Sequence, residues 1–111
     1  MKRFDEALRH LQYAAQLDPG DPIAATLLGQ VLQSAGRFAD AEKWYQVALQ
    51  IDALYDEAYL HIGRLYEQLG RPEAAIASYG TFIGIAKRRP KTEELVEKVR
   101  NRKLRLEALM Q

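Results

Sequence analysis

Apolar side chains recur every three or four residues over most of the chain, which is the spacing of amphipathic helices. In residues 4–17, for example, Phe4, Leu8 and Leu11 fall on one side of a helix. Turn-forming residues separate the segments, with Pro and Gly at 18–22 and glycines at Gly36 and Gly70. This pattern predicts about six antiparallel helices and no sheet, near residues 4–17, 22–35, 38–51, 56–69, 72–86 and 92–109.

Two consecutive stretches, 22–55 and 56–89, repeat one pattern in the same register. The matching landmarks are Leu28-Gly29 with Ile62-Gly63, Gly36-Arg37 with Gly70-Arg71, Ala41 with Ala75, and Tyr45 with Tyr79. A period of about 34 residues with such landmarks is typical of helix–turn–helix repeat arrays.

Both stretches resemble tetratricopeptide repeats. The first departs from the family pattern at Ala25, Leu32 and Ala53, and the second at Phe82, where a small residue is usual. Residues 4–17 resemble the second half of the same repeat, because Phe4 matches Phe38 and Leu11 matches Tyr45. The chain is therefore expected to be a fragment of a longer array or to start on an unpartnered helix.

The resemblance implies an all-α fold, a right-handed α-α superhelix forming a short solenoid. Its single domain would comprise a half repeat (1–21), two repeats (22–55 and 56–89) and a C-terminal capping helix (90–111). Phe82 should push the following helix away or tilt it. Thr92 is expected to cap that last helix, whose apolar stripe would contain Leu95, Val99, Leu106 and Leu109 or Met110.

The resemblance also implies a function, since the first helix of each repeat lines a concave groove that holds a peptide in this family. By position, the lining would come from Ile23, Thr26, Leu27, Gln30 and Gln33 in the first repeat, and from Glu57, Leu60, His61, Arg64 and Gln68 in the second. These side chains could equally be simple solvent-facing residues. The carboxylate clamp of co-chaperone members is not supported, because Thr26, Gln30 and His61 replace its Lys and Asn residues.

Nothing in the sequence assembles a catalytic or metal site. There is no cysteine, and the two histidines, His10 and His61, lie on different repeats without ligand spacing. The repeated glycines are explained by packing and helix ends rather than by a phosphate loop. We therefore expect no enzyme activity, no cofactor, no metal and a protein or peptide as partner. A missing signal peptide or membrane-spanning segment suggests a cytoplasmic protein.

Charge is unevenly distributed. Residues 1–86 hold seven Lys or Arg and eleven Asp or Glu, a net −4, whereas residues 87–111 carry nine and four, a net +5. The basic C-terminal helix also suggests nucleic acid or an anionic surface as an alternative partner. This alternative is less expected, because glutamates lie on the same helix and no aromatic side chain is interleaved for stacking on bases. A further alternative is self-association through the unpaired N-terminal helix, at Phe4, Leu8 and Leu11.

Overall fold

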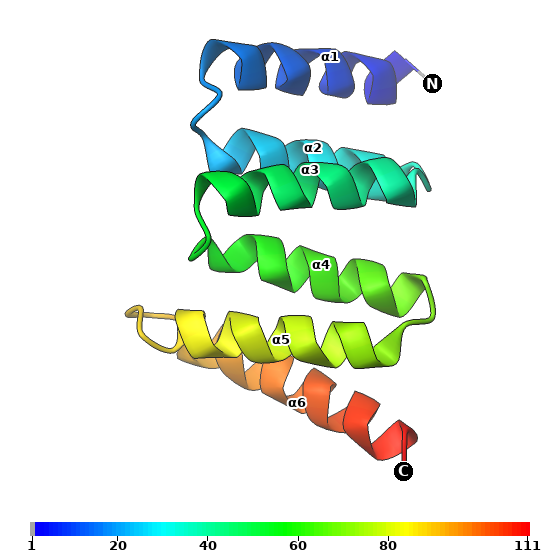
Figure 1. The fold of residues 1–111 in the computed structure, drawn as a ribbon, viewed down its shortest axis with the longest axis vertical. Helices are drawn as coiled ribbons and strands as arrows, with labels where there is room; N and C mark the ends of the chain where they lie inside the picture. The colour runs from blue at the N-terminus through cyan, green and yellow to red at the C-terminus, as the bar shows by residue number, and fades with distance from the viewer. Residues whose placement is uncertain (1) are drawn as a thin grey trace. The chain divides into compact units, whose positions relative to one another are not determined.

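The computed structural model describes residues 2–111 and shows an all-α protein of six helices, with no strand in that range (Figure 1). The helices are α1 (Lys2–Leu17), α2 (Pro22–Ser34), α3 (Phe38–Ile51), α4 (Asp56–Gln68), α5 (Pro72–Ala86) and α6 (Glu93–Leu109). The expected all-α class is thus confirmed, and the expected helix bounds agree closely with those observed. The chain divides into two compact units, Met1–Ala58 and Tyr59–Gln111, each of which is described separately.

The helix ends follow the sequence signals. Asp21 caps α2, since its Oδ1 accepts a hydrogen bond from the backbone N–H of Ile23 at 2.9 Å, with Pro22 at the first helical position. Gly36 and Gly70 adopt positive φ angles of 79° and 69° after α2 and α4. A glycine supplies this left-handed conformation at little steric cost, which explains why both turns use it.

In the first unit, α1, α2 and α3 run antiparallel in succession (Figure 1). The contact between α2 and α3 depends on Gly29, where a Cβ atom would lie 2.4 Å from Cε1 of Tyr45. Tyr45 is fully buried, and its hydroxyl donates a hydrogen bond to Oε1 of Gln33 at 2.6 Å. Tyr45 rather than Trp44 is therefore the inward aromatic of α3.

The second unit repeats this contact between α4 and α5. A Cβ atom on Gly63 would lie 2.4 Å from Cε1 of Tyr79, and the Tyr79 hydroxyl donates to the Glu67 carboxylate. Gly63, Glu67 and Tyr79 occupy the same repeat positions as their counterparts in the first unit. The repeat seen in the sequence is thus a repeat of side-chain packing.

Phe82 is the centre of the second unit's core. It is fully buried, whereas its counterpart one repeat earlier is the small residue Ala48. Around it lie buried residues of all three helices: Leu60, Ala75, Tyr79, Ala86, Val96, Val99 and Leu106. In Figure 1, α6 is inclined to α5 where it crosses it. This inclination agrees with the expectation that a bulky ring at position 82 tilts the following helix.

Two expectations about the last helix are confirmed only in part. Thr92 occupies the N-cap position of α6, but its side chain makes no capping hydrogen bond. Its hydroxyl proton is instead shared between the carbonyl oxygens of Ala86, at 2.6 Å, and Arg89, at 3.0 Å. Thr92 thereby stabilises the C-terminal end of α5. The apolar stripe is also different: Val96 joins Val99 and Leu106 in the core, while Leu95, Leu109 and Met110 are exposed.

Candidate functional site

A pocket of about 360 Å³ lies within the second unit, between α4, α5 and α6. We call it the α4–α6 pocket. Its apolar lining consists of Leu60, Leu95 and Val99, and Tyr79 contributes an aromatic ring. Four charged side chains complete the lining: Arg64, Glu67, Lys98 and Arg102. An apolar interior with a few converging polar groups is the usual composition of a ligand site.

Glu67 organises the charged side of this pocket. Its carboxylate accepts hydrogen bonds from the Arg102 guanidinium, with Nε at 2.9 Å from Oε1, and from the Tyr79 hydroxyl. Burial alone would raise the pKa of Glu67, but the hydrogen bonds from Arg102 and Tyr79 outweigh it and hold the pKa below its usual value. Glu67 therefore stays ionised, and its acceptor capacity is directed to groups of the protein itself.

The pKa of Tyr79 is shifted in the opposite direction. Burial, together with the hydrogen bond to the Glu67 carboxylate, raises the pKa of Tyr79 well above its usual value. Tyr79 thus remains a neutral hydrogen-bond donor at physiological pH, and it helps to fix the carboxylate. Because Glu67 offsets the charge of Arg102, the remaining charges of the lining are the cations Arg64 and Lys98.

Lys98 is only weakly held by the protein. Its Nζ lies 3.5 Å from Oε1 of Glu94, and both side chains are largely exposed. Exposed pairs of this kind contribute about 0–1 kcal/mol, so a ligand carboxylate can compete for the ammonium group. Arg64 is likewise exposed on α4. The pocket therefore combines apolar walls with an excess of positive charge.

Only some of the groove residues expected in the second repeat line the α4–α6 pocket. Leu60 and Arg64 line the α4–α6 pocket. His61 is half-buried and Gln68 exposed on the same helix, and neither belongs to the lining. Glu57, which belongs to the first unit, is exposed and accepts a hydrogen bond from the Tyr55 hydroxyl at 3.1 Å.

In the first unit, Ile23 and Leu27 are exposed on α2 as expected, and Gln30 and Gln33 are half-buried. Thr26 does not belong to an exposed lining. It is 2% exposed, and its hydroxyl donates to the carbonyl of Pro22 at 2.8 Å. A threonine whose hydroxyl donates a hydrogen bond within its own helix can be buried at little cost. The pattern of polar residues in the sequence does not reveal this hydrogen bond.

The contribution of α6 to the pocket does not follow from the sequence analysis, which predicts only a C-terminal capping helix at 90–111. Leu95, Lys98 and Arg102 all line the pocket. They are spaced by three and four residues, which places them on one helix face. This spacing is visible in the sequence and could have indicated a second wall. The residues expected in self-association, Phe4, Leu8 and Leu11, are half-buried on α1.

Other kinds of site find no support in the part of the chain that the structure describes. Within residues 2–111, no group of three His, Cys, Asp or Glu side chains is arranged to hold a metal ion. In the same range, no helix has the length and apolar character needed to cross a membrane.

Comparison with known proteins supports the repeat assignment. Two sequence models, both described as tetratricopeptide repeat, match residues 1–53 and 56–88. Tetratricopeptide repeat protein 1 of Schizosaccharomyces pombe is 29% identical over 82 residues, which cover 71% of this chain but only 8% of that protein.

Solved structures share the fold at lower identity. PcrH of Pseudomonas aeruginosa, in complex with the chaperone-binding region of PopD, superimposes with a TM-score of 0.90 at 22% identity, covering 99% of this chain and 83% of that one. The first repeat domain of Spaghetti (RPAP3), bound to the HSP90 peptide SRMEEVD, gives 0.73 at 21%, covering 90% and 81%. Taken together, the repeated glycine–tyrosine contacts and the two matching sequence models show that the chain belongs to the tetratricopeptide repeat family.

Proposed function

We propose that this protein is a non-enzymatic interaction module that binds an acidic peptide segment in the α4–α6 pocket. The observation that carries the proposal is the combination of apolar walls with the cations Arg64 and Lys98, left over after Glu67 has paired with Arg102. Two structural neighbours are described in complex with peptide segments, and one of these, SRMEEVD, is acidic. These complexes support a peptide segment as the class of ligand.

The geometry suggests how such a peptide would be held. Leu60, Leu95 and Val99 would receive an apolar side chain, and the cations would meet carboxylates next to it. Charge-assisted hydrogen bonds are stronger than neutral ones, and the guanidinium of Arg64 can make two in parallel. Of the groove residues expected in the first unit, Ile23 and Leu27 are exposed on α2, and we propose them separately as a peptide contact of that unit.

Calorimetric titration with the peptide SRMEEVD tests the proposal. Replacing Arg64 by glutamate should weaken binding more than about fivefold, since hydrogen bonds to charged groups contribute about 1.5–3 kcal/mol. Arg71→Glu is the matched control, because Arg71 is also exposed in the second unit but does not line the pocket. Equal losses in the two variants, or none in either, would argue against the pocket as the site.

Self-association through α1 is a second candidate function, favoured by the incomplete cover of that helix. Leu8 and Leu11 are half-buried, and Tyr13 and Leu17 are 62% and 68% exposed. Exposed apolar surface of this kind often marks an interface.

If α1 forms such an interface, light scattering should show a mass that rises with protein concentration. Glutamate at Leu8 and Leu11 should then restore the monomer without unfolding the second unit, because repeat contacts are made between neighbours. Glutamate at the exposed His10 is the control and should change little. A constant monomer mass at high micromolar concentration would exclude this function.

A further inference from the structure

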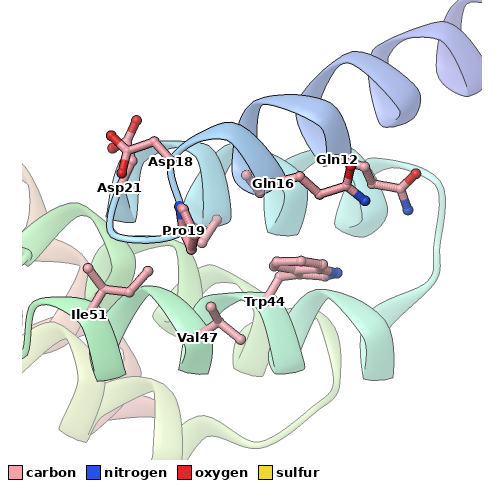
Figure 2. A pocket seen from close by; sticks show the side chains of 10 residues that line it. Gln12, Gln16, Asp18, Pro19, Asp21, Trp44, Val47 and Ile51 are labelled. Atoms are coloured by element: carbon pink, nitrogen blue, oxygen red, sulfur yellow. The ribbon is translucent and has the colours of Figure 1, made fainter.

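A second and larger hollow lies within the first unit, between α1 and α3. We call it the α1–α3 hollow; its volume is about 450 Å³. Its apolar lining comes from four segments: Ala15 on α1, Pro19 in the following loop, Ala25 on α2, and Trp44, Val47 and Ile51 on α3. Figure 2 shows the Trp44 ring lying below α1, with the Gln12 and Gln16 side chains extending from that helix above it. The hollow is thus mostly apolar, with amides along one wall.

The charged residues of this hollow all have one sign. Asp18 and Asp21 line it at the loop between α1 and α2, and no Lys or Arg is among the ten lining residues. In Figure 2 the two carboxylates lie at the edge and point outward. The whole first unit, residues 1–58, has five Lys or Arg against nine Asp or Glu, a net −4. The part of a ligand that extends beyond the edge of the hollow would therefore lie next to negative charge.

A smaller hollow of about 200 Å³ shares two lining residues, Gln12 and Trp44, with the α1–α3 hollow. The smaller hollow is completed by Leu8, Leu32, the ion pair of Arg37 with Asp40, and Lys43, so the uniformly acidic edge belongs to the α1–α3 hollow alone. The two hollows thus follow the seam between α1 and α3 on either side of Trp44. Two neighbouring hollows in a row suit a stretch of polypeptide better than a compact small molecule.

We infer that the α1–α3 hollow is a second docking site, which takes a peptide segment with a large apolar side chain next to a lysine or arginine. The apolar side chain packs against Trp44, Val47 and Ile51, and the basic group outside it faces Asp18 and Asp21. The two carboxylates already accept backbone hydrogen bonds through Oδ1, from Gly20 and Ile23 respectively, so their positions are set before a ligand arrives. The charge preference is opposite to that of the α4–α6 pocket, so one ligand chemistry does not suit both sites.

Trp44 supplies a direct readout, because it is the only tryptophan in the sequence. The probe is the blocked peptide acetyl-KKLLKLLK-amide, titrated into the full chain while the tryptophan emission is recorded. We expect a saturable change in emission, and binding that weakens as salt is added, since exposed charges are screened. The blocked peptide acetyl-EELLELLE-amide has the same apolar residues and should bind at least about fivefold more weakly.

Charge-neutral variants test the acidic edge. The double variant Asp18→Asn and Asp21→Asn retains side-chain oxygens for the turn and the helix cap, because asparagine caps helices as well as aspartate does. It should bind the lysine peptide about threefold to tenfold more weakly, the size expected for two exposed charge contacts. Asp52→Asn is the matched control: Asp52 lies one repeat after Asp18, accepts from the backbone of Leu54 in the same way, and does not line the hollow.

A second pair of variants tests the location. Gln16→Arg places bulk and positive charge on the wall of the hollow and should strongly reduce binding, whereas Gln50→Arg, one repeat later and outside the lining, should not. The inference is overturned if the glutamate peptide binds as well as the lysine peptide, or if Asp18→Asn/Asp21→Asn and Asp52→Asn behave alike. It is also overturned if the emission changes with protein concentration alone, because the occupant is then a second copy of the chain.

Discussion

Replacing Phe82 by alanine should lower the free energy of unfolding of the second unit by about 3–5 kcal/mol, the usual cost of deleting a buried aromatic ring. Phe82 is fully buried and packs with residues of α4, α5 and α6. Its removal leaves a cavity where the three helices meet. Urea denaturation followed by circular dichroism measures the loss as a shift of the transition midpoint.

Phe82→Leu is the control for this substitution, since it retains most of the apolar volume and should cost clearly less than alanine. The comparison is informative because alanine is the native residue at the same position of the first repeat, Ala48, which is also fully buried. If Phe82→Ala left stability within about 0.5 kcal/mol of the parent, as ordinary surface substitutions do, the packing of α6 described above would be incorrect.

Gly63→Ala is the second substitution for which we expect a large effect. The added Cβ atom would lie 2.4 Å from Cε1 of the Tyr79 ring, which cannot retreat easily because its hydroxyl is bonded to Glu67. Inserting a methyl group into a filled contact typically costs about 1–3 kcal/mol, although alanine is otherwise the better helix former. Thermal unfolding of the two proteins compares their stabilities directly.

Gly84→Ala is the matched control within the second unit. Gly84 is also helical, but a Cβ atom there meets nothing within 4 Å. This substitution should leave stability unchanged or raise it by about 0.5–1 kcal/mol, because glycine is unfavourable in a helix interior. A loss at Gly84 equal to that at Gly63 would show that helix propensity, rather than contact with Tyr79, decides the outcome.

The repeat register explains why the fold could be predicted so closely. Gly63 and Tyr79 are recognisable because Gly29 and Tyr45 stand one repeat earlier in the same roles. Because the pattern occurs twice, the residues that recur at the same repeat position can be recognised as those that helix packing requires. Phe82 could also be noticed, because it departs from Ala48 in an otherwise matching frame.

The features that could not be predicted depend on single contacts outside this register. Thr26 and Thr92 look like an exposed residue and a helix cap, yet each donates its hydroxyl to a nearby carbonyl, of Pro22 and Ala86 respectively. Both are therefore buried, and hydropathy alone does not reveal that their hydroxyls are satisfied. Only the three-dimensional arrangement shows that these positions are unavailable to a ligand.

Only the part of the candidate site that follows the repeat register was predicted. Leu60 and Arg64 followed from their repeat positions, but the pairing of Glu67 with Arg102 joins residues 35 positions apart, beyond the second repeat. No repeat pattern predicts such a pair. The α1–α3 hollow was not predicted either, because Trp44 has a serine, Ser78, at the matching position of the second repeat and so is not one of the repeated landmarks.

The most direct test of an acidic-peptide site is nuclear magnetic resonance of the isotopically labelled chain during titration with SRMEEVD. We expect the largest chemical-shift changes at Leu60, Arg64, Leu95, Lys98 and Val99, and no comparable change at Trp44, because the acidic edge of the α1–α3 hollow disfavours this peptide. Changes confined to residues outside the α4–α6 pocket, or no saturable change at millimolar peptide, would contradict the proposed function.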